Sequence, residues 1–166
     1  MRVYLFVMLI AAAVTYLATP LARRLAERAQ AMTPVRDRDV HSVPTPRLGG
    51  LAMLAGLAAS FAVASQVPFL EGVFAESRGP WAILGAGALV CLLGVADDVW
   101  GLDALTKLAG QVLAAGLMAW QGVQLVSLPL AGLTVGSGGF FLVLTVVAVV
   151  VAINAVNIID GLDGLA

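Results

Sequence analysis

Long apolar stretches alternate with short polar segments along the whole chain. Five stretches carry no charged side chain and are candidate membrane helices: Val3–Pro20, Gly49–Val67, Gly79–Ala96, Leu108–Trp120 and Phe140–Ile159. A helix needs about 20 apolar residues to cross a hydrocarbon core of about 30 Å, so the fourth stretch is short for a span. Membrane β-strands would show about ten residues of apolar and polar alternation, which the chain lacks. The pattern predicts an all-α, polytopic membrane helix bundle with about five transmembrane helices.

The segment Gln121–Gly139 separates the last two spans. It is rich in Gly, Ser and Gln and contains a proline, which predicts a loop or a re-entrant segment. Composition supports the membrane class, because only 11% of the 166 residues are charged, whereas soluble domains carry about 25%. Only Arg2 precedes the first stretch, which therefore lacks a strongly basic start, and more arginines follow it. This stretch is expected to be a retained span and not a cleaved signal peptide. We expect residues 1–166 to form a single membrane domain.

Lysine and arginine residues are unevenly distributed between the loops. The first and third loops hold Arg23, Arg24, Arg28, Arg36, Arg38, Arg47 and Lys107, whereas the opposite side holds Arg2 and Arg78. The positive-inside rule then predicts an N-terminus outside and a C-terminal end inside. Three polar clusters, at Arg36–Gly50, Asp97–Lys107 and Asn154–Asp163, would lie together on the cytoplasmic face of a multi-pass protein.

Cysteine and histidine are too scarce for several kinds of site. Cys91 and His41 are single residues of their types, which excludes a disulfide framework, a CxxC metal site and a multi-histidine metal site within this chain. The net charge of −1 gives no reason to expect a nucleic-acid partner.

The segment ADDVWGLDALTKLAGQ carries two adjacent acids at the end of an apolar stretch. Asp97 and Asp98 repel each other unless a cation is present, and their hard oxygen ligands suit Mg²⁺. Lys107 would lie on roughly the opposite side of a continuous helix, so a bend at Gly101 is needed to bring it near the acids. The alternative is an exposed turn at the membrane boundary with a helix-capping aspartate.

The segment HSVPTPRLGG could approach a phosphate. Pro44 and Pro46 favour an extended path, Gly49 and Gly50 allow close backbone approach, and Arg47 could bind the phosphate. The alternative is a rigid loop whose arginine only follows the positive-inside rule.

The segment NAVNIIDGLDGLA places polar groups at the end of the last span. Asn154, Asn157 and Asp160 are spaced by three and share one helical face, and the Asp-Gly steps that follow are expected to end the helix. Polar groups in a membrane are costly and point to function. The alternative is hydrogen bonding between helices.

Together, HSVPTPRLGG, DDVWGLDALTK and NAVNIIDGLDGLA resemble the polyprenyl-phosphate N-acetylhexosamine-1-phosphate transferases of glycosyltransferase family 4. These enzymes transfer a sugar-1-phosphate from a UDP-amino sugar to a lipid phosphate and release UMP. The PTPRLGG form resembles the branch that starts teichoic acid, O-antigen or enterobacterial common antigen synthesis. This implies UDP-N-acetylglucosamine as the donor and undecaprenyl phosphate as the acceptor. The peptidoglycan branch, which uses UDP-N-acetylmuramoyl-pentapeptide and more often carries TPTMGG here, is the alternative.

The resemblance also implies roles for individual residues. Asp97 would engage the lipid phosphate, and Asp98 would order a network of metal and phosphate. Lys107 would contact phosphate, and Asn157 would lie near or on Mg²⁺, for which Mn²⁺ is an alternative. The remaining substrate-binding residues are Arg47 for phosphate and Asp160, Gly161, Leu162 and Asp163 for the uridine pocket. Direct attack and a phospho-enzyme on Asp97 or Asp98 are both compatible with these roles.

Two departures from the family keep alternatives open. Gly101 occupies the position of the third aspartate in the DDxxD pattern, and Asp103 comes two residues later, so no role follows for a third acid. Family members are about twice as long, so the chain is expected to be the N-terminal part of a transferase of a bacterial cytoplasmic membrane. A catalytically inactive fragment and a membrane transporter are the other functions considered, and a homodimer is an alternative to a monomer.

Overall fold

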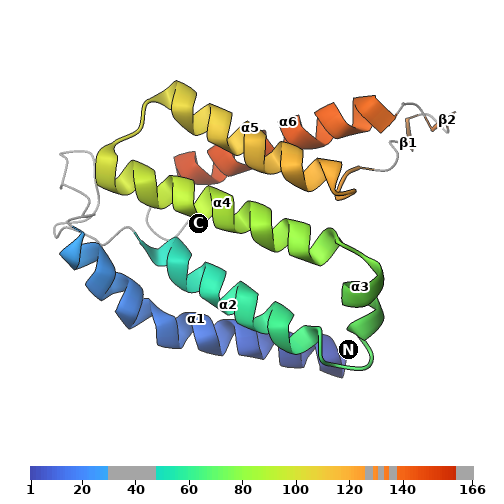
Figure 1. The fold of residues 1–166 in the computed structure, drawn as a ribbon, viewed down its shortest axis with the longest axis horizontal. Coiled ribbons are helices and arrows are strands. Elements are labelled where there is room, and N and C mark those ends of the chain that lie inside the picture. Colours follow the sequence, from blue (N-terminus) through green and yellow to red (C-terminus); the bar gives the residue numbers. More distant parts are fainter. Residues whose placement is uncertain (30–47, 126–128, 131–132, 135–137, 160–166) are drawn as a thin grey trace.

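Helices make up most of the chain that the structure describes. The computed structural model describes residues 1–29, 48–125, 129–130, 133–134 and 138–159. These residues form α1 (Arg2–Arg28), α2 (Gly49–Ala64), α3 (Glu71–Glu76), α4 (Gly79–Trp100), α5 (Ala104–Trp120), β1 (Pro129–Leu130), β2 (Leu133–Thr134) and α6 (Gly138–Ile159) (Figure 1). The prediction of an all-α membrane helix bundle is confirmed.

Each of the five predicted spans corresponds to a helix. Three of the described helices, α1, α4 and α6, are long and apolar enough to cross a membrane, whereas α2 and α5 are shorter apolar helices of 16 and 17 residues. The end predicted for the first span is wrong for the helix, because α1 continues through Pro20 to Arg28. The short helix α3 and the antiparallel pair of two-residue strands were not predicted.

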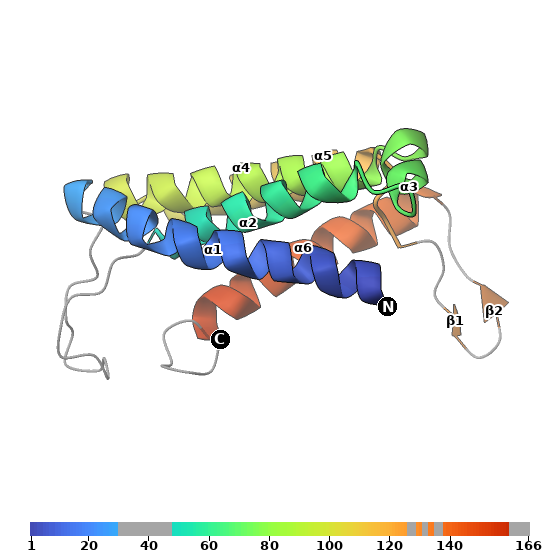
Figure 2. The same cartoon turned by 90° about the horizontal axis from the view of Figure 1, so that it is seen from below.

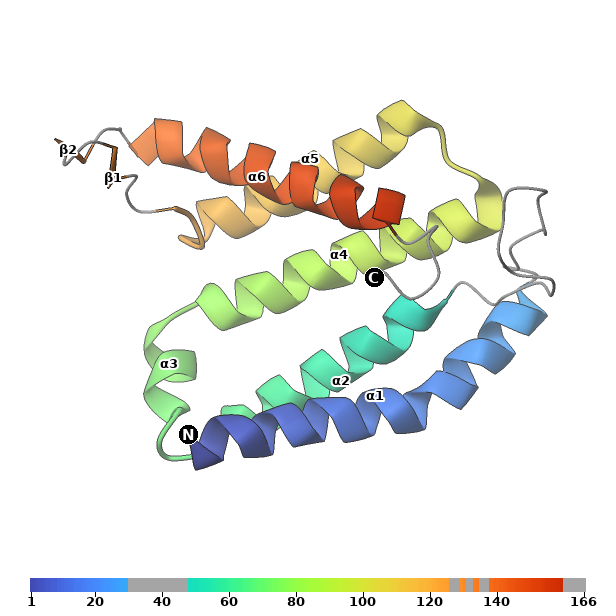
Figure 3. The same ribbon diagram turned by 180° about the vertical axis from the view of Figure 1, so that it is seen from behind.

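The apolar helices lie side by side in the order α1, α2, α4 and α5, and α6 packs on α5 (Figures 1 and 3). Seen from below, α6 crosses the other helices obliquely (Figure 2). The end of α1, the start of α2 and the α4–α5 connection gather at one end of the bundle, and α6 runs toward that end. The N-terminus, α3 and the strand pair lie at the other end. The described parts of the three predicted polar clusters therefore share one end.

Small residues allow α1 and α2 to pack closely. Every fourth residue of α2 is buried, at Ala52, Gly56, Ser60 and Ala64, and residues spaced by four share one helical face. A Cβ atom on Gly56 would lie 2.6 Å from the Ala11 carbonyl oxygen of α1. Membrane helices use such small residues because lipid provides no hydrophobic driving force for their association.

Aromatic rings fix the opposite end of the bundle. Phe74 of α3 lies edge-on between Phe61 of α2 and Trp81 of α4, with ring centroids 5.6 Å apart in both pairs. Edge-to-face pairs at this distance are favourable. The short helix is thereby held between the two spans that it connects.

Candidate active site

A left-handed glycine makes the turn between α4 and α5. Gly101 has φ 66°, and its N–H donates to the Asp97 carbonyl at 2.8 Å. This conformation costs glycine little, because it has no Cβ atom. The chain then reverses over three residues and α5 returns beside α4 (Figure 3). The predicted bend at Gly101 is confirmed.

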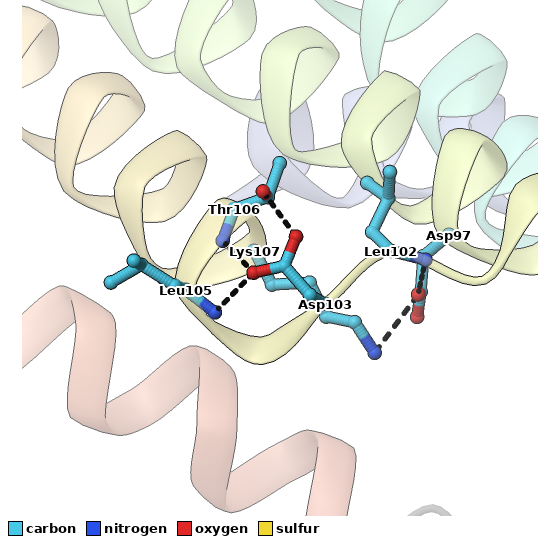
Figure 4. Close-up of polar contacts among 6 residues, drawn as sticks. All are labelled: Asp97, Leu102, Asp103, Leu105, Thr106 and Lys107. Atoms are coloured by element: carbon cyan, nitrogen blue, oxygen red, sulfur yellow. Dashed lines mark hydrogen bonds and ion pairs between the residues drawn. The ribbon is translucent and has the colours of Figure 1, made fainter.

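The turn brings Lys107 to the first acid of the pair. Lys107 Nζ lies 2.9 Å from Asp97 Oδ1, and the Leu102 N–H donates to the same oxygen at 3.0 Å (Figure 4). The two side chains remain 36% and 29% exposed, so solvent screens part of their attraction. The carboxylate is held between a cation from α5 and a backbone donor from the turn.

Asp103 caps the start of α5. Its side chain accepts the Leu105 and Thr106 N–H groups at 3.1 Å and the Thr106 hydroxyl (Figure 4). The Thr106 hydroxyl and backbone N–H hold the pKa of the Asp103 carboxyl below its ordinary value, since both stabilise the charged form. The capping aspartate considered for this cluster is therefore Asp103, and its carboxylate is directed to the helix start.

Asp98 lines a groove on another side of α4. Consecutive residues of a helix point about 100° apart, and Asp98 lies along a groove of about 970 Å³ between α1, α2 and α4. Most of the lining is apolar or small, including Ala12, Leu54, Gly87 and Cys91. The two neighbouring acids therefore lie in different surroundings: Asp97 contacts the α4–α5 connection, and Asp98 lines the groove.

A buried amide pair joins α5 to α6. Asn154 Nδ2 donates to Gln111 Oε1 at 2.6 Å, and Gln111 is only 8% exposed. The alternative of hydrogen bonding between helices is confirmed for Asn154. The sequence interpretation gave no role to Gln111, although it is the polar side chain within the stretch Leu108–Trp120.

The other predicted site residues lie on α6 or outside the described part of the chain. Asn157 is exposed on the last turns of α6. Five predicted residues lie outside the described part of the chain, namely Arg47, Asp160, Gly161, Leu162 and Asp163. Within the described residues, no three His, Cys, Asp or Glu side chains come together as a metal site. The roles assigned to all these residues, and to Asp97, Asp98 and Lys107, stay predictions.

Several known proteins are similar in sequence to a large part of this chain. The chain is 49% identical over 126 residues to the decaprenyl-phosphate N-acetylglucosaminephosphotransferase of Mycobacterium leprae, covering 75% of this chain and 32% of the relative. The protein of the same name from Mycobacterium tuberculosis is 50% identical over 115 residues, covering 69% and 28%. A probable undecaprenyl-phosphate N-acetylglucosaminyl 1-phosphate transferase of Bacillus subtilis is 32% identical over 107 residues, covering 64% and 28%.

The matched region spans about a third of the length of these relatives or less. No solved structure gives a significant match to the chain. The model of the family named glycosyl transferase family 4 matches residues 80–166, more than half of the chain, from α4 to the last residue. This range includes the Asp97–Lys107 pair, Asp98 and the Gln111–Asn154 pair. The chain therefore belongs to glycosyl transferase family 4.

Proposed function

We propose that the complete protein transfers N-acetylglucosamine-1-phosphate from UDP-N-acetylglucosamine to a polyprenyl phosphate and releases UMP. The observation that carries this proposal is the match over three quarters of the chain to relatives named as decaprenyl-phosphate N-acetylglucosaminephosphotransferases. The paired acids and the lysine at one end of the bundle agree with it, because phosphoryl transfer depends on positioning and on neutralising charge. Such a transfer would begin the assembly of a cell-envelope polysaccharide.

The reaction forms one phosphorus–oxygen bond and breaks another. An oxygen of the lipid phosphate attacks the β-phosphorus of the UDP-sugar, and the bond from that phosphorus to the UMP oxygen breaks. A phosphate monoester has its second pKa at about 6, so the acceptor is largely ionised at neutral pH. The protein therefore needs to bring two anions together more than it needs a strong general base.

Lys107 is suited to that electrostatic task. Its ammonium group lies 2.9 Å from Asp97, so the carboxylate holds the cation at the α4–α5 connection before substrate binds. A phosphate oxygen arriving there would receive a positioned donor, which is worth most where water is excluded. Asp97 would in this way orient Lys107 as well as engage the lipid phosphate.

The Asp98 carboxylate also offers oxygen ligands that suit a divalent cation. Mg²⁺ is commonly bound by one or two carboxylates together with substrate phosphates, and does not require a cluster of three acidic residues. Asp98 and Asn157 would hold it, and Mn²⁺ prefers the same oxygen ligands. When bound, the ion would stabilise the negative charge that develops on the phosphoryl oxygens.

The groove beside Asp98 suits an apolar polyprenyl chain. Its lining is almost entirely apolar, and it leads along α1, α2 and α4 to the carboxylate of Asp98. A chain lying there would bring its phosphate to the end of α4 that carries both acids. The lipid phosphate would then approach from the α1–α2 side, and the UDP-sugar from the α5–α6 side.

We place this end of the bundle at the cytoplasmic face of a bacterial membrane. Arg23, Arg24 and Arg28 lie near it on α1, whereas Arg2 and Arg78 lie near the other end, and arginines favour the cytoplasmic side. A donor that arrives from the cytoplasm would meet the acids on this side.

Release of UMP by the complete protein, in detergent with both substrates, tests the proposal. Asp98→Asn removes the charge that faces the groove, and we expect turnover to fall by about 100-fold or more, the scale seen when a group that stabilises the transition state is lost. Asp103→Asn is the matched control, because asparagine caps a helix about as well as aspartate. Near-normal turnover of Asp98→Asn would contradict the role of this residue, and no UMP release by the unchanged protein would contradict the function.

A further inference from the structure

The amide pair between α5 and α6 restricts how the two helices pack. Asn154 Nδ2 donates to Gln111 Oε1 at 2.6 Å and to the Val150 carbonyl at 2.8 Å. Gln111 is almost fully buried, and a buried amide that loses its partner in apolar surroundings carries a desolvation penalty. This bond therefore favours one rotation and one register of α6 against α5.

The amide pair lies one turn away from two residues of the proposed site. Lys107 precedes Gln111 by four residues on α5, and Asn157 follows Asn154 by three residues on α6, so each shares a helical face with its amide. The two helices are antiparallel, as a second hydrogen bond shows, from the Leu125 N–H after α5 to the Thr145 hydroxyl in the first half of α6. From the amide pair, Lys107 and Asn157 consequently lie in the same direction, toward the end that holds the α4–α5 connection.

We propose that Gln111 is a positioning residue for the phosphoryl transfer: its hydrogen bond with Asn154 sets the rotation of α6 and thereby the position of Asn157 relative to Lys107. The inference rests on the proposed function. Gln111 acts through Asn154, so it is distinct from the groups that meet substrate. Because the sequence after Asn157 continues into residues assigned to the uridine pocket, loss of the bond should affect the donor. The groove proposed for the lipid is lined by α1, α2 and α4 and should not change.

Steady-state kinetics of the complete protein can separate these two effects. Gln111→Met keeps the length of the side chain and removes the amide. We expect the KM for UDP-N-acetylglucosamine to rise about three- to twenty-fold, the range that follows from hydrogen bonds between membrane helices, with the KM for polyprenyl phosphate unchanged. The exchange variant Gln111→Asn with Asn154→Gln should restore most of the loss. Gln121→Met removes an exposed amide at the end of α5 and serves as the control.

Three results would overturn the inference. They are an unchanged donor KM in Gln111→Met, an equal rise for both substrates, and a lower thermal stability with normal kinetics, which would mean that the bond only supports folding. A donor effect that the exchange variant reverses would support it.

The position of α6 can also be measured without turnover. Spin labels at Leu113 and Val151, exposed positions on α5 and α6, would report the distance between the helices in a variant whose native cysteines, Cys91 among them, are replaced by alanine. A broader or shifted distance distribution in Gln111→Met supports the positioning role, and an unchanged one overturns it. If the unchanged protein releases no UMP, the proposed function fails, and the label distances still decide whether Gln111 sets α6.

Discussion

Replacing Gly56 by alanine tests the close packing of α1 and α2. A Cβ atom at this position would lie 2.1 Å from Thr15 Oγ1 and 2.6 Å from the Ala11 carbonyl oxygen. Carbon and oxygen atoms of neighbouring helices approach to about 3.3 Å, so the helices would have to separate by roughly 0.7 Å at the carbonyl. The Thr15 side chain can rotate away, but the backbone of α1 cannot move without disturbing its contacts with the other buried small residues of α2, at Ala52, Ser60 and Ala64.

The free-energy cost of this clash can be separated from the higher helix propensity of alanine. Overpacking of a well-packed interior costs about 1–3 kcal/mol, and a backbone obstacle places Gly56→Ala at the upper end, about 3 kcal/mol. Alanine in a helix interior recovers up to about 1 kcal/mol relative to glycine. Gly116→Ala is the matched control, because a Cβ atom there meets nothing within 4 Å. The difference between the two variants isolates the clash and should be about 3 kcal/mol.

Thermal unfolding in detergent, followed by circular dichroism, measures this difference. At about 2–4 °C per kcal/mol for a chain of this size, Gly56→Ala should melt about 6–12 °C below Gly116→Ala. Gly110→Ala should fall between them, because its obstacle at 2.8 Å is the flexible end of the Leu93 side chain. Adding Thr15→Ala to Gly56→Ala should recover only part of the loss. Equal melting temperatures for Gly56→Ala and Gly116→Ala would refute the close approach of the two helices.

Other variants test the remaining contacts and the chemistry. Asp103→Ala should lower the melting temperature more than Asp103→Asn, which keeps a capping side chain. The stability that the ionised Asp103 carboxylate contributes is complete above its unfolded pKa of about 3.9 and is lost as pH falls through its lower folded pKa. Equal pH dependence of the melting temperature in wild type and Asp103→Asn would contradict this contribution. Lys107→Met should reduce kcat/KM for UMP release by about 100-fold, since Asp97 would lose its cation. Removing divalent ions with a chelator should abolish UMP release, and Mg²⁺ should restore it; activity without divalent ions would exclude the proposed metal. Gly87→Leu should fill the groove and raise the KM for polyprenyl phosphate alone, whereas Gly116→Leu should not.

The spans could be predicted from the sequence because each is a long run of apolar residues. The end of the first helix could not, because a proline removes a backbone donor and its ring crowds the preceding turn, which usually ends a helix, whereas membrane helices tolerate this disruption. The Thr19 hydroxyl, next to the proline, donates to the Thr15 carbonyl at 2.7 Å. The helix α3 is too short for a periodic pattern, and its place depends on the rings of Phe61 and Trp81 on two other helices.

At the site, the sequence predicted that a bend would bring Lys107 to the acids, but not which of the two acids would be its partner. Gly101 could be expected to turn the chain, since Lys107 would otherwise point away from the acids. The choice of Asp97 as the partner depends on the rotation of α4 against α5, to which the close contact of Gly110 with Leu93 contributes. The Gln111–Asn154 bond joins residues far apart in the sequence. Spacing within one helix contains no information on such a bond.

The positions of these contacts suggest that the two substrate sides can be changed separately. On one face, α5 holds α4 through Lys107 and Asp97, and one turn later it holds α6 through Gln111 and Asn154. The contact between α1 and α2 is of a different kind, because these helices pack through small residues such as Gly56 and not through polar side chains of this kind. Loosening α6 should therefore weaken the donor side, whereas separating α1 from α2 should change the groove and the KM for polyprenyl phosphate. If Gln111→Met and Gly56→Ala changed the same kinetic constant to the same extent, the two sides would be one mechanical unit and their assignment to different substrates would be wrong.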